Sequence, residues 1–205
     1  SWKSGVVSSL TGGLAGLAKQ RKVEVITGWG QFTSPHAIQV DTSDGAREIR
    51  FKHAIIAVGS ASIKIPGFPY DDPRLIDSTG ALELDSIPER LLVIGGGIIG
   101  LEMATVYHAL GSKVSVVEMA SNLIPGADPD LVRPLQRRIQ RMYENIWLDS
   151  RVTAIRAEKD GLLVSLDGAK APDEDRFDKV LLAVGRSPNG KHIAAGKAGV
   201  LVDVR

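Results

Sequence analysis

The chain has 205 residues, 43% of them apolar, and its 25 lysines and arginines against 24 aspartates and glutamates give a net charge of +1. Such a chain can bury a core in one large or two small domains, and it lacks the concentrated basic excess that a nucleic-acid or anionic-membrane partner requires. It contains no cysteine, which excludes a disulfide, a thiolate nucleophile or a cysteine metal site within it.

The first third of the chain predicts a helix followed by a small sheet. Residues 3–20 have a helical pattern, interrupted by glycines. Three short apolar segments separated by turn residues then predict an antiparallel meander: Val23–Ile26, Ala37–Val40 and Glu48–Phe51. His53–Gly59 predicts a further apolar strand that stops at its glycine, and residues 60–74, with three prolines, predict a loop.

The pattern changes near Pro88. Leu91–Ile94 is continuously apolar, as expected of a parallel strand buried on both faces. A glycine-rich turn, a helix over Leu101–Leu110 that ends at Gly111, and a second apolar strand over Val114–Val117 follow. These segments together predict one βαβ unit.

The last third predicts a helix, a short strand and a second meander. Asp128 and Pro129 have the residue types of a helix start, and the helix is expected to bury Leu131, Leu135, Ile139 and Met142. Ile146–Leu148 predicts a third strand. The meander is expected from three segments: Val152–Arg156, Leu162–Leu166 and Lys179–Val184.

The motif that carries chemistry is a glycine pattern, Gly95-x-Gly97-x-x-Gly100, between the first strand and the helix. Gly95 allows a sharp turn, Gly97 lets a diphosphate approach the backbone, and Gly100 allows close packing of the helix. The helix N-terminus offers free N–H groups to the diphosphate. The alternative is that the glycines only make a tight turn.

An acidic residue lies where this motif requires one. Glu118 follows the second strand, 23 residues after Gly95. A carboxylate there accepts hydrogen bonds from the ribose hydroxyls of adenosine and repels a 2′-phosphate. The sequence therefore predicts NAD rather than NADP as the ligand.

Other candidate residues are either open between a functional and a structural interpretation or are interpreted as structural only. Glu102 and Arg186 fit a binding site or an exposed surface equally well. The four histidines are interpreted as surface or packing residues: His36, His53, His108 and His192. The basic cluster of Arg137, Arg138 and Arg141 is interpreted as the solvated face of a helix.

The longest apolar run does not predict a membrane span. Leu91–Leu101 is too short to cross a bilayer and contains four glycines. We therefore expect a soluble, cytoplasmic protein. Ser1 stands in place of a start methionine, which suggests processing or a fragment.

Several segments resemble one family. Gly95–Glu102 resembles the GGGxIGxE signature of the flavin- and NAD-dependent disulfide reductases, and Ala183–Gly190 resembles their A-x-G-R-x-P-N segment. Segments around Leu10–Leu14, Gly28–Phe32 and Ser78–Leu82 also match, most closely in the bacterial dihydrolipoamide dehydrogenases. The resemblance covers essentially the whole chain.

The resemblance implies positions for two cofactors. Those for NAD are Gly95, Gly96, Gly97, Ile98, Ile99, Gly100, Leu101, Glu102, Glu118, Val152, Gly185 and Arg186. Those for FAD are Gly28, Gly30, Val58, Gly59 and Ser60. It implies an α/β fold, with a Rossmann-like βαβ domain and meander over residues 88–205 and the C-terminal part of an FAD-binding segment over residues 1–87. Ala57-Val58-Gly59 departs from the family's A-T-G, which puts a hydroxyl contact in doubt.

The resemblance also implies an activity for a longer parent enzyme. There, dihydrolipoamide or a lipoyl domain of a 2-oxo acid dehydrogenase complex reduces a redox disulfide, and the resulting thiolate passes electrons to FAD. Reduced FAD then gives hydride to NAD⁺, in a homodimer. This chain would be an internal fragment without catalytic residues or a metal site, and inactive alone. Two alternatives stay open: a segment of a sister flavoprotein reductase or transhydrogenase, and a non-catalytic nucleotide-binding module.

Overall fold

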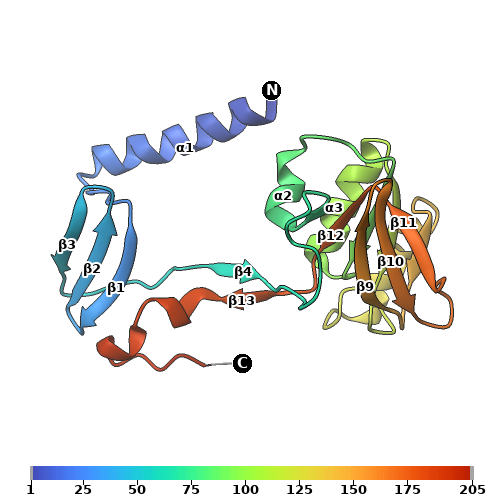
Figure 1. Cartoon of the computed structure of the whole chain (residues 1–205). Helices are drawn as coiled ribbons and strands as arrows, with labels where there is room; N and C mark the ends of the chain where they lie inside the picture. Colours follow the sequence, from blue (N-terminus) through green and yellow to red (C-terminus); the bar gives the residue numbers. More distant parts are fainter. Residues whose placement is uncertain (1, 204–205) are drawn as a thin grey trace. The chain divides into compact units, whose positions relative to one another are not determined.

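The computed structural model describes residues 2–203, which form two compact units (Figure 1). Unit 2 contains Ser60–Ser187, and unit 1 contains the chain before and after it. The chain therefore passes between the units twice. The domain boundary expected after residue 87 separates an FAD-binding part from an NAD-binding part, which is a different division from that into compact units. It stays a prediction.

Unit 2 is built on a five-stranded parallel sheet. Its strands, in spatial order, are β5 (Leu75–Ile76), β12 (Lys179–Leu182), β6 (Arg90–Ile94), β7 (Lys113–Val117) and β8 (Asn145–Trp147). Successive side chains of β6 point to opposite faces, so Leu91 packs in one core cluster and Leu92 in the other. Both faces of the sheet are covered, which explains why its central strands are apolar throughout.

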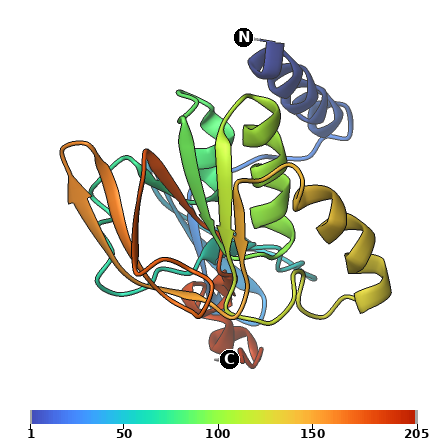
Figure 2. The same ribbon diagram turned by 90° about the vertical axis from the view of Figure 1, so that its right-hand side faces the viewer.

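Helices cover one face of this sheet and an antiparallel meander covers the other (Figure 2). The helices are α2 (Ser78–Glu83), α3 (Ile98–Ala109) and α4 (Pro129–Ile139). The meander consists of β9 (Arg151–Glu158), β10 (Gly161–Asp167) and β11 (Glu174–Phe177), in the order β11-β10-β9. Unit 2 is thus a three-layer α/β structure with a core on each side of the central sheet.

Unit 1 contains a helix, a second meander and two short 3₁₀ turns. The elements are α1 (Trp2–Gln20), β1 (Trp29–Ser34), β2 (Ala37–Thr42), β3 (Gly45–Arg50), η1 (Asn189–His192) and η2 (Ala195–Ala198). A small cluster of Phe32, Ile193 and Ala195 joins the meander to the C-terminal turns. Phe32 N–H donates to the Ile193 carbonyl at 2.9 Å, which fixes the same junction.

The two passages of the chain between the units lie side by side. β4 (Ser60–Ser62) pairs with β13 (Arg186–Pro188) in a two-stranded ribbon. Ile63 N–H donates to the Gly185 carbonyl at 3.1 Å, and Asn189 N–H donates to the Gly59 carbonyl at 3.0 Å. Hydrogen bonds therefore flank the ribbon at both ends.

Most elements expected from the sequence are confirmed, and two strands are wrong. The helix over 3–20 and the strands of the βαβ unit lie where predicted, and α3 begins three residues earlier than expected. Val23–Ile26 and His53–Gly59 are not strands. No strand in the described residues pairs with either segment, and Val25 and Ile55 are 73% and 95% exposed. An apolar segment becomes a strand only where a partner satisfies its backbone.

Two further expectations need correction in unit 2. Lys179–Leu182 is not part of the meander but lies inside the parallel sheet as β12, and the third meander strand is the more polar β11. Leu131 is 71% exposed, because Val132, Leu135 and Ile139 define the buried side of α4. Within residues 2–203, no helix has both the length and the apolar character that crossing a membrane requires.

Candidate nucleotide-binding groove

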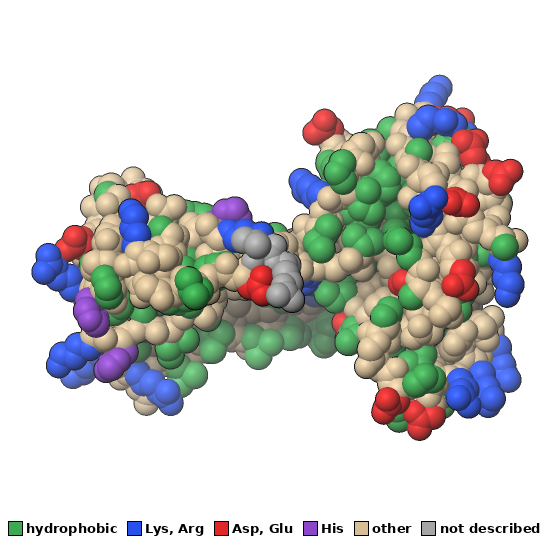
Figure 3. Space-filling model, turned by 90° about the horizontal axis from the view of Figure 1, so that it is seen from below, with side chains coloured by type: hydrophobic (Ala, Val, Ile, Leu, Met, Phe, Trp, Pro, Cys, Tyr) green, Lys and Arg blue, Asp and Glu red, His purple; other side chains and the backbone are tan. Residues whose placement is uncertain are grey.

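A groove of about 600 Å³ lies at the carboxyl ends of three neighbouring parallel strands in unit 2. Ile94, Val117 and Leu182 are the last residues of β6, β7 and β12, and all three line it. In Figure 3, hydrophobic side chains gather in the middle of the face that unit 2 presents, with charged side chains mostly around them. In open α/β sheets this edge is where ligands bind.

The glycine loop between β6 and α3 forms the floor of the groove. Gly95 has φ +108°, and a Cβ there would overlap the Ala183 carbonyl oxygen. A Cβ on Gly100 would overlap the Gly95 carbonyl oxygen, so this glycine lets α3 approach the loop. A Cβ on Gly97 would meet nothing within 4 Å. Gly95 and Gly100 are therefore required by packing, whereas Gly97 leaves open space.

The start of α3 is not capped by a side chain. Gly97 is the N-cap residue and has no side chain to bond the first amides. Ile98 and Ile99, the first two helical residues, line the groove. The first N–H groups of the helix thus remain available beside the groove, where the helix dipole favours a negative charge.

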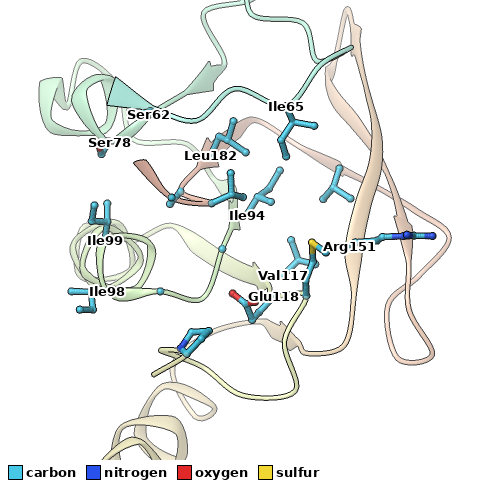
Figure 4. Close-up of a pocket in the computed structure, with 18 of the residues that line it drawn as sticks. Ser62, Ile65, Ser78, Ile94, Ile98, Ile99, Val117, Glu118, Arg151 and Leu182 are labelled. Atoms are coloured by element: carbon cyan, nitrogen blue, oxygen red, sulfur yellow. The ribbon is translucent and has the colours of Figure 1, made fainter. Parts of the chain in front are cut away.

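Glu118 is fixed directly after β7 by two backbone amides. Its Oε2 accepts a hydrogen bond from Gly96 N–H at 2.7 Å, and its Oε1 accepts one from Ala120 N–H at 2.8 Å. Figure 4 shows the carboxylate directed toward the glycine loop and the helix that carries Ile98 and Ile99. Each carboxylate oxygen retains a lone pair, because an ionised carboxylate can accept about four hydrogen bonds.

Arg186 also lines the groove, and hydrogen bonds to serine hydroxyls and to a backbone carbonyl hold its guanidinium group. Its Nε donates to Ser60 Oγ at 2.7 Å, and one terminal nitrogen also donates to the Ser60 carbonyl. The other terminal nitrogen lies 3.5 Å from Ser62 Oγ and 3.4 Å from Ser78 Oγ. The guanidinium therefore connects β13 with β4 and with the start of α2.

The structure brings together most positions that the resemblance associates with NAD. Those lining the groove are Gly95, Gly97, Ile98, Ile99, Glu118, Val152, Gly185 and Arg186. Gly96 takes part through its amide bond to Glu118. Gly100 and Leu101 are buried beneath the loop, and Glu102 is exposed on α3, outside the lining.

Sequence reasoning missed the loop that follows Glu118. Met119, Ile124 and Pro125 line the groove, and Ile124 N–H donates to the Gly96 carbonyl at 2.9 Å. Their position after a strand of the parallel sheet was the available signal. Arg151 also adjoins the groove, but its guanidinium points away from it (Figure 4) and pairs with Asp167 at 2.7 Å.

The positions associated with FAD are divided between the units. Gly28, Gly30 and Val58 line a second groove of about 450 Å³ in unit 1. A Cβ on Gly28 would overlap the Asp41 carbonyl oxygen, so this glycine is needed for the close approach to β2. Gly59 is the last residue of the first segment of unit 1 and lies outside this lining. Ser60 belongs to unit 2, where its hydroxyl oxygen accepts a hydrogen bond from Arg186.

Comparison with known proteins then decides the family. A family model described as pyridine nucleotide-disulphide oxidoreductase matches residues 3–205. The chain belongs to this family. Among curated relatives of this family, dihydrolipoyl dehydrogenase of Vibrio cholerae serotype O1 is 54% identical over 205 residues, covering 100% of this chain and 43% of the relative. The corresponding protein of Haemophilus influenzae is 50% identical over 204 residues, covering 99% and 42%.

Solved structures of flavoprotein disulfide reductases share the fold. A variant of the HOCl-induced reductase RclA from Escherichia coli, in complex with Cu(II), is 29% identical with a TM-score of 0.86, covering 98% of this chain and 45% of that one. LpdA from Mycobacterium tuberculosis is 21% identical with a TM-score of 0.85, and the match covers 97% of this chain and 44% of that one. It shows the same fold. The α/β fold expected for this family, a parallel sheet with antiparallel meanders, is thus confirmed. The chain spans less than half the length of these relatives.

Proposed function

We propose that the groove of unit 2 binds NAD(H). The observation that carries this proposal is the position of the Glu118 carboxylate beside the glycine loop, held by Gly96 and Ala120. It can accept hydrogen bonds from the two hydroxyls of an adenosine ribose. The open space over Gly97 and the uncapped start of α3 accommodate the diphosphate.

The charge of Glu118 supports NAD over NADP. A 2′-phosphate in the same position would meet a carboxylate, and repulsion between two anions in a half-enclosed groove is strong. No arginine or lysine bonds to Glu118 in the described chain to offset its charge. The opposite end of the groove, with Arg186, Ser62 and Ser78, offers hydrogen-bond donors for the nicotinamide half.

We further propose that the whole protein is a dihydrolipoyl dehydrogenase, as its relatives are named. The groove of unit 1, with Gly28, Gly30 and Val58, would hold part of FAD, with Gly59 and Ser60 beside it. When bound, FAD and NAD⁺ supply the hydride-transfer chemistry. Dihydrolipoamide or a lipoyl domain as substrate, a homodimer and a cytoplasmic location belong to the same proposal. The 205 residues contain no cysteine, so a redox pair has to come from elsewhere in the protein.

The test is a calorimetric titration of the chain with NADH and NADPH. Glu118→Gln keeps one acceptor oxygen but removes the charge. We expect it to weaken NADH binding about tenfold, since a charge-assisted hydrogen bond contributes about 1.5–3 kcal/mol, and to reduce the preference over NADPH. Glu89→Gln, at the opposite end of the sheet and paired with Lys113, is the matched control.

Two results would contradict the proposal. The first is a folded wild-type chain, judged by circular dichroism, that binds NADPH as tightly as NADH or binds neither. The second is an equal response of the Glu118 and Glu89 variants.

A further inference from the structure

The solvent side of α4 carries a face of arginines. Arg133, Arg137 and Arg138 lie on the helix, and Arg141 lies in the turn that follows it. All four are exposed, and we call them the arginine face. At a rise of 1.5 Å per residue, they cover about 12 Å along the helix axis.

Most other arginines of the described chain have carboxylate partners, whereas these four do not. Seven arginines form ion pairs with carboxylates: Arg47, Arg50, Arg74, Arg90, Arg151, Arg156 and Arg176. Within residues 2–203, no carboxylate pairs with the arginine face, and none of its guanidinium groups donates a hydrogen bond. Its guanidinium groups therefore form no direct ion pair within the described chain.

Helix stability does not account for this arrangement. Cations favour the last turn of a helix, which holds Arg137 and Arg138, but Arg133 lies earlier. Arg133 and Arg137 lie four residues apart on α4, where like charges repel and weaken a helix. An anionic partner would reverse that cost.

The surroundings of the face indicate a short partner rather than a long polyanion. Asp128 and Asp130 lie at the start of α4, and Glu144 follows its end, so acidic side chains limit the face in both directions along the chain. A nucleic-acid backbone or an anionic membrane extends beyond 12 Å and would meet these carboxylates. Leu131, 71% exposed beside the arginines, offers an apolar contact.

We propose that the arginine face of α4 is a docking surface for an acidic segment of a partner protein that also carries an apolar residue. The planar guanidinium groups bind carboxylates through paired hydrogen bonds, which lysines do not do equally well. Leu131 takes the apolar residue. This interaction is independent of the nucleotide groove, whose lining includes no residue of α4.

The test uses a labelled synthetic peptide of alternating leucine and glutamate, titrated with the whole chain and followed by fluorescence anisotropy. The same peptide with glutamine in place of glutamate is the ligand control. We expect Arg137→Glu/Arg138→Glu to weaken binding of the acidic peptide at least about tenfold. The matched control is Lys159→Glu/Lys170→Glu, an equal charge change at exposed positions of the same unit, with an effect below about twofold.

Binding that weakens as salt rises, and that is lost only in the arginine variant, supports the docking surface. The proposal fails if the chain ignores the acidic peptide, if the glutamine peptide binds equally, or if both double variants lose the same affinity. It also fails if duplex DNA or phosphatidylserine vesicles bind this face more tightly than the peptide. NADH titration of the variants distinguishes this failure from a failure of the proposed function.

Discussion

At the scale of single residues, two positions of the glycine loop are glycine for different reasons. Gly100 stands where any Cβ would overlap the Gly95 carbonyl oxygen and approach Val93 Cγ1 at 3.1 Å. Gly97 has a φ of −79°, which any residue adopts, and open space around it. One glycine is therefore a requirement of the fold, and the other is free to serve a ligand.

Alanine at these two positions should have opposite effects. We expect Gly100→Ala to lower the free energy of unfolding of unit 2 by about 2 kcal/mol, because the overlapping oxygen belongs to the backbone. Gly97→Ala should leave it within about 0.5 kcal/mol but weaken NADH binding about tenfold or more. Urea unfolding can be followed by Trp147, the tryptophan of unit 2, with Trp2 and Trp29 replaced by phenylalanine. Equal stability of the two variants would refute this assignment.

At the scale of elements, two helices of unit 2 begin with aspartate but use it differently. The carboxylate of Asp77 accepts from Thr79 N–H at 2.9 Å and from Gly80 N–H at 3.1 Å, before α2. Asp128 occupies the same position before α4 but makes no such bond. The same residue type is thus a full cap in one helix and only a favourable charge in the other.

This difference predicts unequal costs of substitution. Asp77→Ala should reduce the stability of unit 2 by about 1 kcal/mol, the usual cost of losing an N-cap. Asp128→Ala should cost roughly 0.3–0.5 kcal/mol, because only its interaction with the helix dipole is lost. The same Trp147 unfolding assay measures both variants. A larger loss for Asp128→Ala would show that α4 is capped by its side chain after all.

At the scale of the whole molecule, the two units differ in how much they bury. Unit 2 contains two extended apolar clusters, one on each face of its sheet. Unit 1 has a small cluster around Phe32, and no residue of α1 is buried. Large apolar side chains of α1 are exposed, among them Trp2, Leu10 and Leu14.

Amide exchange should therefore differ sharply between the two longest helices. α1 contains four glycines and no tertiary burial, so we expect protection factors below about 10 for its amides. Amides of α3, packed against the parallel sheet, should be protected about a thousandfold or more. Hydrogen–deuterium exchange with mass spectrometry measures both helices in one sample. Strong protection of α1 would mean that the helix is covered in solution.

The sequence was sufficient to predict the structure where a pattern depends on residues close together in the chain. The βαβ unit and most of the groove could be predicted, because the order and spacing of Leu91–Ile94, the glycines and Glu118 along the chain are enough to identify them. It was insufficient where the outcome depends on distant partners. Val23–Ile26 has the pattern of a strand, but no strand in the described part of the chain pairs with it. Lys179–Leu182 pairs with β5 and β6, more than 80 residues earlier in the chain. Arg186 and Ser60, 126 residues apart, meet for the same reason.

The two amide bonds of Glu118 bear on any redesign of cofactor preference. Replacing this residue with arginine or lysine, the direct way to attract a 2′-phosphate, would also remove the acceptor for Gly96 N–H and Ala120 N–H. Those amides hold the turn after β6 and the turn after β7 against one another. A redesign that succeeds has to introduce a positive charge nearby and keep an acceptor at this position, so it requires at least two coordinated substitutions.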